Sequence, residues 1–338
     1  MGAFQFIFSR HFVKNQSESS SRHFELPYAE KMRRAEMHFS FAEKTMFYVL
    51  IGLLCVSTYA LFAKANTFFT TEIPARGGSL SEGIIGSPRF INPLLSISDA
   101  DRDLTALVYS GLMKATPDGS LTEDLTESYV ISEDGLTYDF FIKAGLTFHD
   151  GTPLTAEDVA FTVQKAQDPG LKSPRRASWE GVEVMVLNDR EIRFILSQPY
   201  APLLENTTLR ILPKHLWESV ANEEFPFSAY NFDPVGSGPF KVNQITRDGG
   251  GIPKSYTLVP FEDYASGAPY LSSLTLSFYG STEALEEAYL SGDIESVNGI
   301  APERVSIFQK EEANILATPL PRIFGVFFNQ DQATLLAD

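Results

Sequence analysis

The chain has 338 residues and a formal net charge of −16, with 43% apolar and 21% charged residues. This length allows for roughly two domains, and this composition excludes a chain that is disordered throughout. A nucleic-acid backbone needs a basic binding surface, so the acidic balance predicts no nucleic-acid partner. The single cysteine, Cys55, excludes an intramolecular disulfide and a cysteine-rich zinc site.

A hydrophobic segment separates two regions of different charge. Residues 45–63 carry no charged side chain, and a helix of that length spans roughly 28 Å, about the hydrocarbon thickness of a membrane. A buried core helix is the alternative, although such a helix normally has a polar stripe. The region up to Lys44 has seven basic and five acidic residues, whereas the region from Ala65 onward has 19 basic and 38 acidic residues. The positive-inside rule then predicts a cytoplasmic tail over 1–44 and a periplasmic or cell-surface body, with 45–63 crossing the cell membrane once.

The hydrophobic segment can be an anchor or a cleaved signal. Ala63-Lys64-Ala65 has small residues at the spacing that a signal peptidase accepts. However, the segment is longer than a usual signal core and follows a long tail, unless Met32 is the true start. We therefore favour an uncleaved anchor, followed by a tether over 64–78 that ends in a Gly-Gly turn.

Short helices and strands alternate in the acidic body. The apolar spacing predicts a helix over Ser98–Met113, capped by Ser98 or Asp99, and a second helix that begins at Thr155 with Asp158 at the capping-box spacing. Alternating apolar residues predict a strand, a hairpin and a further strand, and a short helix follows: 137–142, 182–186 with 192–196, 274–278, and 282–291. This mixture indicates an α/β or α+β class.

The body has no recognisable catalytic or metal-binding motif. HExxH, the P-loop and GxSxG are all absent. Asp99, Asp101 and Asp103 alternate as in a calcium loop, but the sixth position is not glycine, so these acids fit the first turn of a helix better. The Gly-Ser-Gly at 236–238 predicts a turn that enters a strand, and His149 beside an Asp-Gly pair predicts a hydrogen-bonded turn histidine. We expect no catalytic residue, metal or cofactor.

Several ordered blocks in the body resemble one protein family. Two long blocks, 125–140 and 145–159, carry most of the resemblance. The shorter blocks follow the same order: 77–80, 91–93, 109–112, 212–215, 234–240 and 324–329. Together they resemble the family 5 extracellular solute-binding proteins, which are the oligopeptide, dipeptide and nickel receptors of ABC importers. Tyr129 stands where the family usually has Trp, and Phe261–Ala265 departs from its Asn-x-x-Tyr-Trp block, which bears on the solute more than on the fold.

The resemblance implies an α/β fold of type II periplasmic-binding-protein-like lobes, with mixed sheets and flanking helices, preceded by one transmembrane helix. Lobe I takes residues 79–110 and 232–321, and domain II takes 111–231. Residues 322–338 begin a lobe III that is otherwise missing. In the family the ligand lies between lobes I and III, so the chain is either a fragment, which we favour, or a protein that has lost solute binding.

The resemblance places one ligand-contact segment after the Asn-Pro turn, at Ile97, Ser98 and Asp99. Asp99 can accept hydrogen bonds from a ligand ammonium group. Capping of the following helix is the alternative role of this residue.

A second contact segment follows the Asp-Pro pair at 168–169. Arg175 and Arg176 can pair with a carboxylate, and Trp179 can form the wall of a pocket. The alternative is a solvated loop with Trp179 facing the core. The family's main charged anchors for a peptide lie in the missing lobe.

The resemblance implies a non-enzymatic, membrane-anchored substrate-binding component of an ABC importer, with peptides as the expected solute. The protein would capture the solute by lobe closure and deliver it to permease subunits. Two alternatives remain open: a membrane-anchored hydrolase with dispersed catalytic residues, and a sensor or surface protein that kept the fold without transport.

Overall fold

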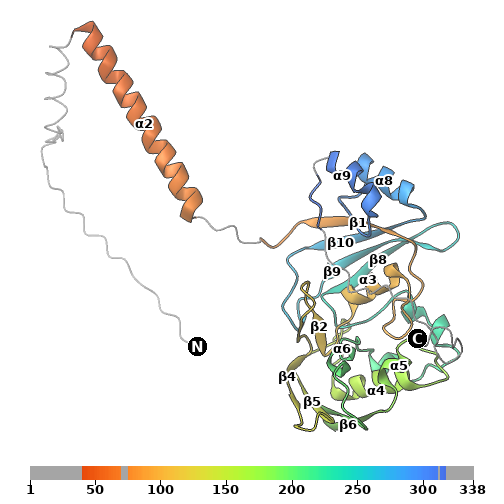
Figure 1. Cartoon of the computed structure of the whole chain (residues 1–338). Helices are drawn as coiled ribbons and strands as arrows, with labels where there is room; N and C mark the ends of the chain where they lie inside the picture. The colour runs from red at the N-terminus through yellow and green to blue at the C-terminus, as the bar shows by residue number, and fades with distance from the viewer. Residues whose placement is uncertain (1–39, 70–74, 311–312, 317–338) are drawn as a thin grey trace, which may run out of the picture. The chain divides into compact units, whose positions relative to one another are not determined.

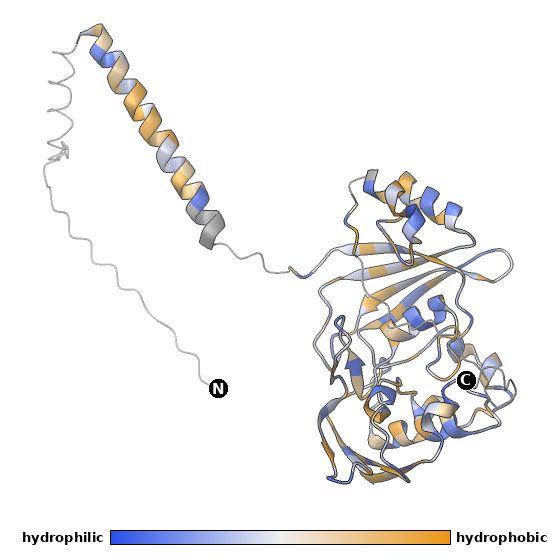
Figure 2. Ribbon diagram, in the orientation of Figure 1, coloured by the Kyte–Doolittle hydropathy of each residue, from blue (hydrophilic) through white to orange (hydrophobic). Residues whose placement is uncertain are grey.

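The computed structural model describes residues 40–69, 75–310 and 313–316 and divides the chain into two units, 1–73 and 74–338. The first unit contains helix α2 (Phe41–Phe69), whose residues 41–64 are long and apolar enough to cross a membrane (Figure 1). Hydrophobic residues cover most of this helix in Figure 2, and none of its most apolar window is buried.

Helix α2 is longer than the uncharged segment. It continues through Lys64 to Phe69, in the first part of the predicted tether. Residues 64–69 contain neither glycine nor proline, so nothing in them ends the helix. The first six residues of the predicted tether thus continue the helix. Gly77 and Gly78, where the sequence predicts a turn, lie in irregular backbone before β1, with φ values of 125° and 74°.

The second unit contains a five-stranded sheet in the order β11-β1-β10-β9-β8. Strand β1 runs parallel to β10 and β11, and the other pairs are antiparallel. The strands are β1 (Ser79–Ile85), β8 (Phe240–Arg247), β9 (Pro253–Pro260), β10 (Ser273–Tyr279) and β11 (Ser296–Val297). The predicted strand 274–278 and helix 282–291 are confirmed as β10 and α8 (Thr282–Ser291).

A four-stranded antiparallel sheet has the order β4-β5-β7-β6. Its strands are β4 (Thr126–Ile131), β5 (Thr137–Ile142), β6 (Val182–Asn188) and β7 (Glu191–Leu196). The predicted strand 137–142 and the predicted hairpin are confirmed, with Val184 opposite Phe194. Strands β2 (Met113–Ala115) and β3 (Leu121–Glu123) form a separate pair.

Helix α4 (Ala156–Gln167) covers the β6–β7 hairpin. It begins as predicted: the Asp158 carboxylate accepts hydrogen bonds from the Thr155 backbone N–H at 2.9 Å and from the Thr155 hydroxyl at 3.1 Å. Val159 and Val163 are buried on its inner face. Apolar spacing therefore located both the start and the buried side of this helix.

Helix α3 (Asp99–Val108) is shorter than predicted and lies beside β8 (Figure 1). Tyr109 already has an extended backbone, with φ −119° and ψ 153°, and Met113 belongs to β2. The prediction that the helix reaches Met113 is wrong. The apolar residues after Val108 are buried in extended backbone, so their spacing did not reveal the end of the helix.

The remaining helices are short. They are α5 (Arg176–Trp179), α6 (Leu203–Asn206), α7 (Lys214–Trp217), α9 (Val305–Lys310), and the 3-10 helices η1 (Phe225–Phe227), η2 (Ala229–Asn231) and η3 (Pro302–Arg304). One hydrophobic core joins side chains of both larger sheets and of α3 and α4, and it includes the fully buried Trp179 and Trp217. Residues 322–338, where the sequence predicts the start of lobe III, lie outside the described residues, as do residues 1–39 of the predicted tail over 1–44.

Candidate functional site

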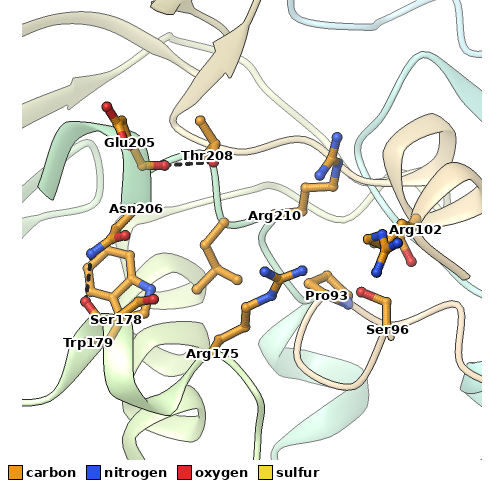
Figure 3. A pocket seen from close by; sticks show the side chains of 12 residues that line it. Pro93, Ser96, Arg102, Arg175, Ser178, Trp179, Glu205, Asn206, Thr208 and Arg210 are labelled. Atoms are coloured by element: carbon orange, nitrogen blue, oxygen red, sulfur yellow. Dashed lines mark hydrogen bonds between the residues drawn. The ribbon is translucent and has the colours of Figure 1, made fainter. Parts of the chain in front are cut away.

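A cavity of about 190 Å³ opens between α3, the loop before it, and the segments around α5 and α6 (Figure 3). Its wall contains residues from parts of the sequence that are about a hundred residues apart. The residues that matter most for its chemistry are Ser96, Arg102, Thr105, Arg175, Trp179 and Arg210. The fold brings positive charge, hydroxyl groups and one aromatic ring to the same place.

The predicted contact segment 97–99 begins helix α3. The Ser98 hydroxyl accepts a hydrogen bond from the Asp101 N–H at 3.1 Å, and the Asp101 carboxylate accepts one from the Ser98 N–H at 3.2 Å. Asp99 is exposed and forms an ion pair with Arg102. Ser98 thus caps the helix, and Asp99 lies in its first turn. None of the three residues of this segment lines the cavity, although both flanking stretches do, and ligand contact by them stays a prediction.

The second predicted segment divides between the cavity and the surface. Arg175 and Trp179 line the cavity. Arg176 does not, and its guanidinium lies 3.6 Å from the Glu180 carboxylate on the exposed side of α5. Trp179 is only 2% exposed and packs on Phe194 with 5.4 Å between ring centroids. Trp179 thus packs in the core and also lines the cavity. Its two predicted roles, a core residue and a pocket wall, are therefore compatible.

Sequence reasoning missed Arg102, Thr105 and Arg210. Arg102 and Thr105 are three residues apart on α3 and therefore share a helix face. This spacing indicates from the sequence that the two side chains lie close together, but only the fold shows that their helix face borders the cavity. Arg210 lies in the segment after α6, directly before buried Ile211, and nothing in its neighbourhood singles it out.

The cavity wall contains three arginines and one acidic residue, Glu205. Burial lowers the pKa of Arg210; the Asp124 charge opposes this shift, and the nearby guanidinium of Arg175 adds to it. Burial also lowers the pKa of Arg175, with a contribution from Arg102. Partial loss of solvation and the neighbouring guanidinium groups disfavour the charged form of both arginines, whereas the Asp124 carboxylate favours it at Arg210.

A second cavity of about 250 Å³ shares Thr208 and Arg210 with the first. Asp124 lies in its wall and is nearly buried. The hydroxyls of Tyr264 and Ser266 donate hydrogen bonds to Asp124 Oδ1 at 2.9 and 3.0 Å. Burial, followed by the Asp124 charge, raises the pKa of Tyr264 to about 12, so its hydroxyl keeps the proton that it donates. This network ties the loop after β9 to the strand pair β2–β3.

His149 is a turn histidine, as the sequence predicts. Its Nδ1 accepts a hydrogen bond from the Gly236 N–H at 3.3 Å, and its Nε2 lies 3.0 Å from the Gly238 carbonyl oxygen. Burial lowers its pKa to about 4, which keeps the ring neutral. Within the part of the chain that the structure describes, no three His, Cys, Asp or Glu residues are grouped to hold a metal ion.

The Gly-Ser-Gly segment at 236–238 is a packing element of the fold. A Cβ atom at Gly236 would lie 2.0 Å from the Val108 carbonyl oxygen, and one at Gly238 would lie 2.5 Å from the Val108 carbonyl carbon. The Gly238 N–H donates to that same oxygen at 2.8 Å. The two glycines therefore allow the strand-entering turn to pack against the last turn of α3, where a side chain has no room.

Comparison with known proteins gives a consistent result. The family model described as bacterial extracellular solute-binding proteins, family 5 Middle, matches residues 120–338, which is more than half of the chain. The oligopeptide-binding protein AppA of Bacillus subtilis is 34% identical over 231 residues, covering 67% of this chain and 41% of AppA. The probable D,D-dipeptide-binding periplasmic protein DdpA of Escherichia coli is 26% identical, covering 75% of this chain and 49% of DdpA.

Solved structures agree with these relatives. The structure of AppA in complex with a nonapeptide matches with a TM-score of 0.63 and 32% identity, covering 70% of this chain and 47% of AppA. The ABC transporter substrate-binding protein CtaP of Listeria monocytogenes matches with a TM-score of 0.61 and 33% identity, again covering 70% and 47%. The chain thus spans about half the length of the proteins that it matches. It belongs to the family 5 bacterial extracellular solute-binding proteins, and its fold is that of the type II periplasmic binding proteins.

Proposed function

We propose that this protein is the substrate-binding component of an ABC importer and that its solutes are peptides. The observation that carries the proposal is the similarity to AppA, which is named as an oligopeptide-binding protein and whose solved structure contains a nonapeptide. The cavity supports it, because two residues of a predicted contact segment, Arg175 and Trp179, lie in its wall. Peptide receptors bind main chain through hydrogen bonds and bind charged ends through ion pairs, and this wall offers both kinds of group.

The proposed site extends along the start of α3. Ser96 and Arg102 line the cavity on either side of the segment 97–99, so a solute in the cavity would pass close to Ile97 and Asp99. We assign residues 79–110 and 232–321 to lobe I and residues 111–231 to domain II. Residues 322–338 are assigned to the beginning of a third lobe. Closure of lobe III over lobe I would complete the site and exclude water from it.

Helix α2 is the proposed membrane anchor, with its N-terminal end in the cytoplasm and the second unit outside. Its length and its uncharged segment support this assignment. A tethered receptor stays close to the permease, which raises its effective concentration there. The same arrangement accounts for the separation of a weakly basic tail from a strongly acidic body.

Calorimetric titration of the full chain in detergent micelles with peptides of two to nine residues tests the proposal. We expect saturable binding with one site for at least one peptide length. Mass spectrometry of the recovered peptides should show them intact, because a receptor performs no chemistry. Failure of every peptide to bind would contradict the proposal, and cleavage of a peptide would favour the hydrolase alternative.

A further inference from the structure

Strand β6 is an open edge of the four-stranded sheet. It pairs with β7 on one side only, because the sheet has the order β4-β5-β7-β6. Helix α4 covers one face of this hairpin, whereas Met185 and Leu187 of β6 are 42% and 38% exposed. An edge of this kind presents unpaired N–H and C=O groups that can pair with another strand.

The ladder shows which backbone groups of β6 face the open side. Leu196 donates its N–H to the Leu136 carbonyl oxygen at 2.8 Å, so the backbone groups of Leu196 point toward β5. Val182 lies opposite Leu196, and its own groups therefore point away from β7. In agreement, the Val182 carbonyl oxygen accepts a hydrogen bond from the Gln167 side chain at 2.6 Å. Every second residue of β6 after Val182 shares this orientation.

These residues are Val184 and Val186. In the part of the chain that the structure describes, no hydrogen bond reaches their N–H or C=O groups from the open side. A second copy of β6, antiparallel and related by a twofold axis at Met185, would place Val184 of each copy opposite Val186 of the other. Each such pair can exchange an N–H···O bond in both directions. The open groups of β6 are therefore complementary to those of a second β6.

The charge pattern of β6 allows this self-pairing. An axis at Met185 places Glu183 opposite Leu187 of the second copy, so no two carboxylates oppose each other along the strand. On β7, Arg193 lies beside Met185, and its guanidinium donates to the Asp139 carboxylate at 2.6 and 2.7 Å. These two charges cancel, so the sheet surface beside the axis carries no net charge to oppose the approach of a second copy.

The other edges in the described sheets are less suited to pairing. Strands β2, β3 and β11 have three residues or fewer. Strand β8 carries Lys241 and Arg247 and has two register shifts, and β4 is followed by the acidic residues Glu133 and Asp134. Short length, charge and irregularity are the means by which proteins keep edge strands from pairing. Strand β6 has seven residues with one charge, Glu183, and its register shift lies only at its end.

We propose that β6 pairs antiparallel with β6 of a second copy of this chain, so that two four-stranded sheets join into one around a twofold axis at Met185. The pairing would satisfy the open backbone groups and cover the exposed Met185 side chains. A single strand pair buries less than the roughly 1,600 Å² of a standard interface, so the association is weak between free molecules. Copies held in one membrane by the proposed anchor α2 would meet at a higher effective concentration.

Disulfide trapping tests the position of the axis. The full chain with Cys55→Ser is reconstituted into phosphatidylcholine vesicles, with either Met185→Cys or the control Val130→Cys. Val130 is 56% exposed and lies on β4, at the opposite edge of the same sheet. Opposed residues that share no backbone hydrogen bond have Cα atoms about 4.5 Å apart, a separation that a disulfide spans. We expect oxidation to join the Met185→Cys chains about tenfold faster than the Val130→Cys chains.

Charge variants test the same contact without a new covalent bond. Energy transfer is measured in vesicles between copies that are labelled at Ser40→Cys in the Cys55→Ser background. Met185→Lys should weaken the association about fivefold, because like charges then face each other, and Met185→Glu should do the same. A mixture of Met185→Lys and Met185→Glu chains should associate again, whereas the control Val130→Lys should keep the original transfer.

Equal cross-linking at residues 185 and 130, including none at either, would leave β6 facing solvent and overturn the inference. Faster cross-linking at residue 130 would assign the contact to β4 and overturn it as well. Charge variants at residue 185 that leave the energy transfer unchanged would also contradict it. Neither readout uses a solute, so these results leave the receptor proposal intact.

Discussion

Arg175 and Arg176 are neighbours in the sequence, but the structure gives them different surroundings. Arg175 is half-buried in the cavity wall, whereas Arg176 is exposed and paired with Glu180. An exposed ion pair contributes little to stability, about 0–1 kcal/mol. A partly desolvated guanidinium without a partner has much more to gain from an anionic ligand. Residue type alone therefore does not distinguish a binding group from a surface charge.

Replacement of Ser98 by alanine tests its capping role. We expect Ser98→Ala to lower the free energy of unfolding by about 1 kcal/mol, because the Asp101 N–H loses its acceptor. Urea denaturation followed by tryptophan fluorescence measures the change, since Trp179 and Trp217 are both buried. A loss of peptide affinity with unchanged stability would instead assign Ser98 to ligand contact.

The buried ring of His149 predicts a loss of stability in acid. Its pKa is about 4 in the folded protein and about 6.5 when unfolded, so the unfolded chain binds more protons between these values. Stability is therefore highest above pH 6.5 and falls as the pH drops toward 4, by roughly 3 kcal/mol from this residue. Urea denaturation of the wild type and of His149→Gln at several pH values measures it. The variant should lose less stability over that interval, and an identical loss would contradict the assignment.

At the scale of elements, the end of α3 is decided by its contact with the turn at 236–238. The helix stops at Val108, whose carbonyl oxygen accepts the hydrogen bond of Gly238. The chain then turns into extended backbone and continues to β2. A contact between segments more than a hundred residues apart thus ends the helix.

A methyl group at Gly238 should break this contact. We expect Gly238→Ala to cost about 1–3 kcal/mol of unfolding free energy, because its Cβ meets backbone atoms of residues 107 and 108 that cannot move aside. The control is Gly249→Ala, where a Cβ meets nothing within 4 Å. Urea denaturation of both variants should show a large effect only at Gly238. Similar effects at the two positions would point to backbone entropy rather than to packing.

Helix α2 can be tested through its cysteine. Cys55 is the only cysteine of the chain and lies in the middle of the uncharged segment. If α2 crosses the membrane, a water-soluble maleimide should leave Cys55 unlabelled in intact membranes and label it after solubilisation and unfolding. Gel-shift analysis measures the labelled fraction. The control is Ser40→Cys, just before the helix, which should be labelled in membranes opened to the cytoplasmic side.

At the scale of the whole molecule, Asp124 joins parts of the chain that are about 140 residues apart. It accepts hydrogen bonds from Tyr264 and Ser266, and Lys143 donates to its backbone carbonyl oxygen at 2.7 Å. Residue 124 lies between β3 and β4, in the region assigned to domain II, and 264–266 lie in the region assigned to lobe I. The network therefore fixes the contact between these two regions.

Loss of the Asp124 charge should loosen this contact. We expect Asp124→Asn to lower the free energy of unfolding by about 1–3 kcal/mol, because the hydroxyls of Tyr264 and Ser266 lose the charged acceptor, Asp124, that is itself buried. The control is the neighbouring Glu123→Gln, whose side chain is exposed. Hydrogen exchange measured by mass spectrometry should show faster exchange around 261–267 in Asp124→Asn only. Unchanged exchange would mean that the network does not hold this loop.

Local features of the sequence determined a large part of this protein. The uncharged segment 45–63 predicted the long apolar helix, and alternating apolar residues predicted the hairpin at 182–196, because these patterns depend only on neighbours along the chain. The capping pair Thr155 and Asp158 located the start of α4. The ordered blocks at 125–159 indicated the family, which the comparisons confirm.

Only the tertiary structure decided where α3 ends, which of the two arginines at 175 and 176 lines the cavity, and that Arg210 lies there as well. The cavity is built from segments near residues 96, 105, 175 and 210, and no periodicity links positions so far apart. Burial, lost solvation and nearby charge arise from packing in three dimensions. These quantities distinguish a partly buried arginine in a cavity wall from an exposed one, and they arise only when the chain is folded.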